Sequence, residues 1–204
     1  MLHDPAEVRS AFAAAAHTFL ATIEDIADDT WDRPGALGEW TVRQLAGHTL
    51  RAFSTIDTYL GAEKTSDRLI ADTAEYYRTT LGDPAIHASV AQRGRDAGAL
   101  LTDPVGESQA TSQRVLALIA STLDEDVVNT LAGQITFSEY LATRVVELGV
   151  HTLDLQRASG QLVGLTDETS TLIIAVLAEL APPSQLILAL SGRAALPTGF
   201  NVLG

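Results

Sequence analysis

Four ionisable residues between positions 144 and 154 are spaced so that they gather on one side of a helix. At about 100° per residue, Arg144, Glu147, His151 and Asp154 fall in a single narrow arc. The rest of the segment is apolar on two opposite sides, which is typical of a helix buried at the centre of a bundle. Glu147 and His151 are four residues apart, so their side chains reach the same region. A buried carboxylate needs a positive partner there, either within the chain or as a metal ion.

A further candidate ligand, His48, occurs nearly a hundred residues earlier. It lies at the edge of a helical apolar stripe, beside Ala52, where a histidine alone is usually a hydrogen-bonded core residue. Ligand sites in helical bundles, however, are built from inward-facing side chains of adjacent helices. Two imidazoles and one carboxylate leave a coordination position open, as catalytic metal sites do. We therefore expect His48, Glu147 and His151 to hold one divalent cation, with an internal ion pair of Glu147 as the alternative.

Four other residues are weaker candidates around this site. Asp154 follows His151 by three residues and could accept its second N–H, or it could be a solvent-facing charge. Arg144 either pairs with Glu147 or faces an anionic substrate. Arg193 could anchor a carboxylate because arginine makes bidentate contacts. Trp40 either holds a Pro/Gly-rich connector against the bundle or lies near the mouth of the site.

Helix signals dominate the chain. Asp4-Pro5 predicts the start of a helix that runs to about residue 28, and Thr41 with Gln44 forms a capping box for a second helix. Asp83-Pro84 and Asp103-Pro104 repeat the opening signal. Ser138 with Glu139 opens the helix that carries the polar arc, and Gly160 closes it. Another helix is expected over 167–180, and residues 186–190 could form a strand or a helical turn. No alternating strand pattern is visible elsewhere, which favours an all-α, up-down bundle.

Composition excludes several classes of function. The formal net charge of −13, from 26 acidic and 13 basic residues, argues against nucleic-acid binding. No apolar run is long enough to span a bilayer, and the N-terminus lacks a signal sequence, so we expect a soluble, cytoplasmic protein. The sequence contains no cysteine. Disulfides, thiolate metal sites and a protein thiol nucleophile are therefore excluded.

Two segments resemble a known family. "WDRPGALGEWTVRQLAGHT" and "EYLATRVVELGVHTLDLQRASG" are similar to the DinB-like superfamily, and within it to the N-terminal domain of mycothiol-dependent maleylpyruvate isomerases. The resemblance covers roughly residues 5–160 and implies a DinB-type four-helix bundle over 1–160. Residues 161–204 would form a helix and tail packed on that bundle. The chain resembles a short form, because the isomerases carry a substantial second domain after the bundle.

The resemblance also implies a chemistry. His48, Glu147 and His151 would hold a divalent metal, zinc first, with nickel or iron as alternatives. The metal would bind mycothiol as a thiolate, which attacks a small electrophilic substrate and leads to S-transfer or cis–trans isomerisation. Two other functions remain open: a DinB-like stress or binding protein with a non-catalytic metal, and a non-haem iron oxygenase. Whether the protein is a monomer or a homodimer also stays open.

Overall fold

The fold is mostly helical, with two small antiparallel β-hairpins. The computed structural model describes residues 3–64, 66–81 and 84–203, the last range without the side chains of 84–91. The elements in chain order are α1 (Pro5–Glu24), η1 (Asp28–Thr30), β1 (Pro34–Leu37), β2 (Trp40–Thr41), α2 (Val42–Leu60), α3 (Thr73–Leu81), α4 (Pro84–Leu100), α5 (Pro104–Ser121), β3 (Val127–Thr130), β4 (Gly133–Thr136), α6 (Phe137–Ser159), α7 (Asp167–Leu180) and α8 (Pro183–Leu190). The predicted all-α class is thus confirmed in broad terms.

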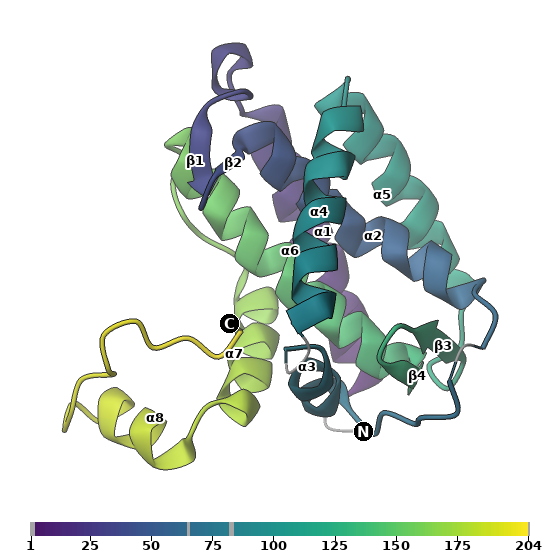
Figure 1. The fold of residues 1–204 in the computed structure, drawn as a ribbon, viewed down its shortest axis with the longest axis vertical. Helices are drawn as coiled ribbons and strands as arrows, with labels where there is room; N and C mark the ends of the chain where they lie inside the picture. The colour runs from purple at the N-terminus through teal and green to yellow at the C-terminus, as the bar shows by residue number, and fades with distance from the viewer. Residues whose placement is uncertain (1–2, 65, 82–83, 204) are drawn as a thin grey trace.

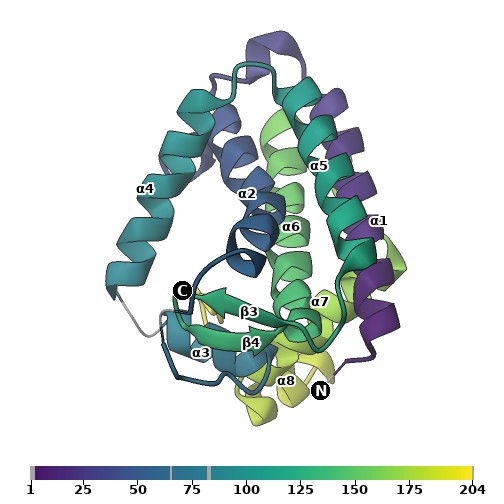
Figure 2. The same ribbon diagram turned by 90° about the vertical axis from the view of Figure 1, so that its right-hand side faces the viewer.

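α6 is the central helix of the fold. It packs against α1 and α2, while α5 covers the outer side of the same pair (Figure 2). The core between them includes Phe12, Phe19 and Phe53, with the Phe12 and Phe53 rings in edge contact at 5.4 Å between centroids. α2 and α6 run in opposite directions, so residues late in α2 lie beside residues early in α6 (Figure 2). The DinB-type four-helix topology itself stays a prediction.

Several helix ends match their predicted signals. The side chain of Asp4 accepts a hydrogen bond from the Ala6 amide, and Thr41 and Gln44 form the reciprocal capping box at the start of α2. Gly160 ends α6 in the left-handed conformation, with φ of 75°. α4 begins at Pro84 as expected, although its predicted cap, Asp83, lies outside the described residues. Local capping chemistry therefore defines most helix boundaries.

Three predictions about secondary structure were wrong or imprecise. The first helix ends at Glu24 rather than near residue 28, and a short 3₁₀ turn follows. α6 begins at Phe137, because strand β4 leads directly into it and Thr136 takes the N-cap position instead of Ser138. The β1–β2 and β3–β4 hairpins were not expected. Residues 186–190, left open between strand and turn, belong to helix α8.

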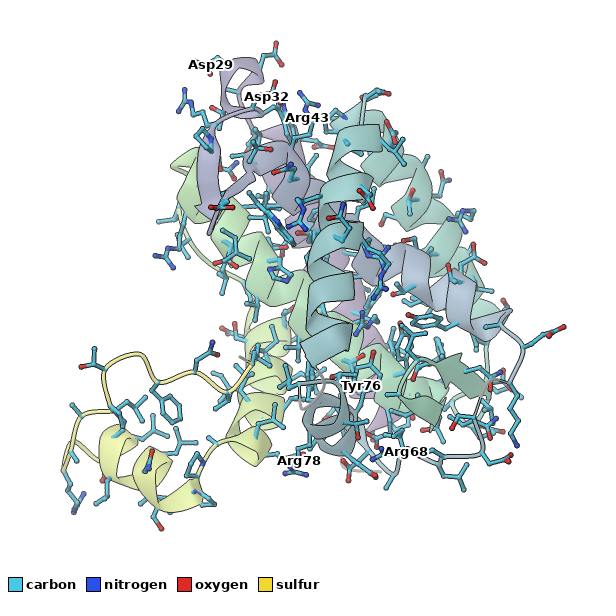
Figure 3. The ribbon with its side chains drawn as sticks, in the orientation of Figure 1. Asp29, Asp32, Arg43, Arg68, Tyr76 and Arg78 are labelled. Atoms are coloured by element: carbon cyan, nitrogen blue, oxygen red, sulfur yellow. The ribbon has the colours of Figure 1, made fainter. Side chains whose placement is uncertain are left out.

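The β1–β2 hairpin is fixed to the bundle by the residues around it. Trp31 is buried, and the guanidinium of Arg43 stacks over its ring at 5.7 Å from the centroid. Arg43 also donates to Asp32 at 3.0 Å and to the Leu101 carbonyl at 3.1 Å. Figure 3 shows Arg43 and Asp32 close together at this end of the molecule. These contacts hold the segment before β1 against α2.

The β3–β4 hairpin holds α3 against α6. Backbone hydrogen bonds of 2.8 Å join Gln134 to Arg68 and to Ile70, in the segment before α3. Gly133 adopts φ of 139°, and any Cβ there would collide with the Arg68 carbonyl oxygen. At the start of α3, the amide and hydroxyl of Thr73 donate to Glu139 Oε2 at 3.0 and 2.8 Å. α3 is therefore docked on α6 by hydrogen bonds between distant parts of the chain.

α4 lies on α2 through contacts between glycines. A Cβ on Gly47 of α2 would lie 2.5 Å from the Gly98 nitrogen of α4. Gly98 in turn has no room for a Cβ beside the Gln44 backbone. One turn earlier, Gly94 faces Trp40 and His48, where a Cβ would lie 2.7 Å from Trp40 Cη2. Glycine at these positions allows the two backbones to approach closely.

The C-terminal region has a packed part and an extended part. α7 packs on α1 and α6 with Leu172, Ile173 and Val176 buried. α8 and the following segment extend to one side of the bundle before the chain turns back (Figure 1). α8 has no buried residue. Among the described residues, no helix combines the length and apolar character needed to cross a bilayer. The division at residue 160 stays a prediction.

Candidate metal centre

The three predicted ligands converge in space. His48 comes from α2, whereas Glu147 and His151 lie one turn apart on α6. One ligand atom from each residue can be chosen so that all three lie within 4.8 Å of one another. The His48 and His151 rings meet edge to face, with centroids 4.8 Å apart. Residues a hundred positions apart in the sequence thus form one cluster at the contact between α2 and α6.

The hydrogen bonds around Glu147 and His151 leave one atom of each facing the other. His151 Nδ1 lies 3.4 Å from Asp154 Oδ2, and Glu147 Oε1 accepts a hydrogen bond from the Tyr77 hydroxyl. The remaining atoms, His151 Nε2 and Glu147 Oε2, are 3.6 Å apart. A tetrahedral cation with bonds of about 2.0–2.1 Å requires ligand atoms about 3.4 Å apart. This pair therefore needs little movement to chelate one ion.

His48 provides the test of whether a cation fits. Its Nδ1 is buried and has no hydrogen-bond partner among the described residues. Burial, reinforced by the nearby His151, lowers the pKa of His48 to about 3, so the ring is neutral at physiological pH. A neutral imidazole keeps one unprotonated nitrogen, which needs a donor or a cation. A divalent metal would be such a partner, and the donor set of two imidazoles and a carboxylate suits zinc, nickel or iron.

Glu147 and His151 stabilise each other's charged forms. Burial opposes the ionisation of both groups. For Glu147, the hydrogen bond with His151 and the charge of Arg144 outweigh burial and lower its pKa to about 2. For His151, contacts with Asp154 and Glu147 raise its pKa to about 9. The ion pair considered as the alternative is thus formed by these two residues. It does not explain His48, which is the residue that separates the two interpretations.

Arg144 does not form an ion pair with Glu147 in the structure. Its Nε donates to Thr143 Oγ1 at 2.9 Å. Its guanidinium stacks over Tyr140 at 4.8 Å and over Tyr76 at 5.9 Å from the ring centroids. Tyr76 lies on α3, below the start of α4 (Figure 3). Arg144 is therefore held by aromatic rings, with Glu147 one helical turn away.

The other two predicted residues have different positions. Trp40 lies against the cluster of candidate ligands, with its ring centroid 4.8 Å from that of His48. Arg193 is exposed in the C-terminal segment and donates to the nearby Ser191 carbonyl at 3.1 Å. It is absent from the residues that line the cavity described below. The structure therefore does not bring Arg193 to the site.

Tyr77 is a contributor that the sequence did not reveal. Its hydroxyl lies 3.2 Å from Glu147 Oε1 and 3.1 Å from the Thr143 carbonyl oxygen, and it donates a hydrogen bond shared between them. Burial, together with the charge of Glu147, raises the pKa of Tyr77 well above its usual value, so the hydroxyl remains a donor. This contact orients the carboxylate. No spacing within the sequence links Tyr77 to α6, so only the fold could show it.

The cluster opens into a cavity of about 390 Å³. The side chains of His151 and Glu147 keep 16% and 28% of their surface exposed, so both can be reached from it. Apolar walls come from both hairpins, through Leu37 and Leu131. Asn201 and Leu203 of the C-terminal segment complete the lining. A volume of this size suits a small organic molecule.

Comparison with known proteins identifies the family. A family model described as the mycothiol maleylpyruvate isomerase N-terminal domain matches residues 12–156, more than half of the chain. The chain belongs to this family. The match to the mycothiol maleylpyruvate isomerase N-terminal domain includes His48, Glu147 and His151 and ends before α7. It confirms the resemblance drawn from the sequence. No curated protein and no solved structure matches the chain at a significant level.

Proposed function

We propose that the protein is a metal-dependent enzyme that uses a low-molecular-weight thiol, mycothiol, to act on a small electrophilic substrate. The observation that carries this proposal is the open cluster of His48, Glu147 and His151 at the wall of a cavity of about 390 Å³. A structural metal site would be closed by four protein ligands, whereas three ligands beside a cavity leave a position for exchange. Membership of a family named for mycothiol supports the choice of thiol.

The residues present would hold zinc, with nickel or iron as alternatives. A cation there would lower the pKa of a thiol that reaches the site and so supply a nucleophile at neutral pH. The chain itself contains no cysteine, so the sulfur has to come from a small molecule. Asp154 and Tyr77 would keep His151 and Glu147 in their ligating orientations. Trp40 and Leu37 would keep water away from one side of the reaction.

The bond changes on the substrate define two reactions of one class. In S-transfer, a sulfur–carbon bond forms and the leaving group departs with the electron pair of the bond that breaks. In isomerisation, the sulfur adds to a carbon–carbon double bond, rotation follows, and elimination restores both the double bond and the thiol. Both need a polarised substrate and a thiolate, and neither needs an oxidant. A soluble, cytoplasmic location and independence from nucleic acids remain predictions.

The decisive experiment combines elemental analysis with a thiol assay. Purified protein should contain close to one equivalent of a divalent metal, and it should accelerate conjugation of mycothiol with 1-chloro-2,4-dinitrobenzene or isomerisation of a cis-configured enone. His48→Ala should lose the metal and the acceleration together. His17→Ala, which changes an exposed histidine on α1, is the matched control.

Two outcomes would contradict the proposal. Metal bound by His48 without any acceleration would indicate the non-catalytic binding protein. Iron in the site with oxygen consumption, and no dependence on a thiol, would indicate an oxygenase.

A further inference from the structure

Three arginines line the cavity although the protein is strongly acidic. Arg51 of α2, Arg93 of α4 and Arg144 of α6 all line it. The whole sequence has only 13 basic residues against 26 acidic ones, so three arginines around one cavity are a local reversal of charge. Among the described residues, the acidic side chains that line the cavity are Glu147 and Asp154, and both already contact His151.

The helical geometry places two of these arginines on the same side of the three candidate metal ligands. Arg51 follows His48 by three residues, and Arg144 precedes Glu147 by three. Three residues correspond to about 4.5 Å along a helix. Because α2 and α6 run in opposite directions, both displacements point toward α3 (Figure 2). The cavity therefore has a metal-binding end and, about one helical turn away, a cationic end.

Among the residues that the structure describes, no carboxylate forms an ion pair with Arg51 or Arg144 at this end. The Arg51 guanidinium has neither a hydrogen bond nor an ion pair among the described residues, and it is only partly exposed. Arg144 donates to Thr143 Oγ1 and otherwise stacks on tyrosine rings. Burial, followed by the charge of Arg93, lowers the pKa of Arg51, so these cations repel each other. Cationic groups gathered in a partly buried space are costly unless an anion joins them.

We propose that Arg51 and Arg144 form a subsite for an oxyanion group of the substrate, a carboxylate or a phosphate, one helical turn from the metal cluster. Guanidinium groups bind such oxyanions through paired hydrogen bonds. Arg93, on the third side, adds positive charge to the same region. A substrate held there presents its reactive carbon toward His48, Glu147 and His151. That the oxyanion belongs to the enzyme's substrate rests on the proposed function, but binding of an anion at this subsite does not require the metal.

The test compares two thiols that differ in one charge. Binding of 3-mercaptopropionate and of 3-mercaptopropionamide to the zinc-loaded 204-residue chain is measured by calorimetry. The acid should bind at least about 10-fold more tightly than the amide, since a hydrogen bond to a charged group contributes that much or more. Arg51→Gln should remove the preference, and Arg51→Lys should restore only part of it. Arg95→Gln, on the exposed side of α4, should keep the full preference.

A second arm separates failure of the subsite from failure of the metal site. Metal-free protein is titrated with succinate and with inorganic phosphate, and binding that depends on Arg51 supports the subsite. The tighter of the two identifies the oxyanion. If zinc and thiol bind but acid and amide bind equally, the subsite is wrong and the proposed function stands. If zinc does not bind but succinate binding still depends on Arg51, the subsite is supported and the proposed function is wrong. Binding of neither anion in an Arg51-dependent way overturns the subsite.

Discussion

α6 and α8 differ in a way that their amino-acid composition does not suggest. α8, with the sequence PSQLILAL, is the more apolar of the two, yet none of its residues is buried. α6 carries several charged residues and still buries Glu139 and Arg144. Two carboxylates of α6 have partners on α3: the Thr73 amide and hydroxyl donate to Glu139, and the Tyr77 hydroxyl donates to Glu147. Position in the fold, rather than hydrophobicity alone, decides burial, and a polar residue in a central helix therefore carries functional information.

The largest difference between the two helices should appear in stability. Leu148→Ala in α6 removes a side chain with no exposed surface and should lower the free energy of unfolding by about 2–5 kcal/mol. Urea denaturation monitored by circular dichroism gives this value. A loss below about 0.5 kcal/mol would show that α6 is not the packed centre of the fold.

The next effect concerns the metal. Glu147→Gln removes the ligand charge but keeps the shape of the side chain, so zinc affinity should fall by about 100-fold or more while the fold remains. Competition with a chelator measures the affinity. Glu125→Gln, an exposed carboxylate, is the control. Loss of folding with unchanged zinc content would instead favour a purely structural ion pair.

A smaller effect is expected at the helix contact above the site. Gly94→Ala would place a methyl group 2.8 Å from His48 Nδ1, so α4 or the histidine must move. The free energy of unfolding should fall by about 1–3 kcal/mol, and zinc affinity should fall with it. Gly164→Ala, where a Cβ meets open space, should change neither. Equal behaviour of the two variants would contradict the close packing of α4 on α2.

Tyr77→Phe should have a more modest effect on the metal. It removes the hydroxyl that lies 3.2 Å from Glu147 Oε1 but keeps the ring. Loss of such a supporting hydrogen bond typically lowers metal affinity by about 10-fold or more. Tyr76→Phe, in the same cavity wall, should leave zinc affinity unchanged. If both variants bind zinc like the original protein, Tyr77 does not orient the carboxylate.

The smallest effect should come from α8. Leu190 is 80% exposed, so Leu190→Ala should change the free energy of unfolding by less than about 0.5 kcal/mol. The measurement is the same urea titration as for Leu148. A loss of unfolding free energy comparable with that of Leu148→Ala would show that α8 is covered in solution. The contrast between a buried α6 and an exposed α8 would then be wrong.

Much of the helical framework could be predicted because its signals are local. Asp4, Thr41 with Gln44, and Gly160 each act through atoms within a few residues, and the structure confirms each of them. The hairpins were missed because strands of two to four residues give too short an alternation. β3 does alternate, with Val128 buried and Val127 exposed, so a weak signal was present.

The candidate site also has a part that local sequence patterns predict and a part that they do not. The spacing of Glu147 and His151 follows from one helix, and His48 could be added because polar residues on apolar faces are rare. Tyr77 and Gly94 lie on α3 and α4, whose positions depend on contacts between distant segments. No local pattern encodes such contacts. Arg193 was proposed from its residue type alone, and the structure leaves it outside the cavity.

The docking of α3 has a kinetic consequence. Its links to Gln134 and Glu139 span large sequence separations, 66 residues for the Thr73–Glu139 pair. Contacts of this kind incur a loop-closure entropy cost and form late, after the local helices. The wall that carries Tyr77 would therefore be completed near the end of folding, and brief local opening of α3 would expose its amides to hydrogen exchange before those of α6.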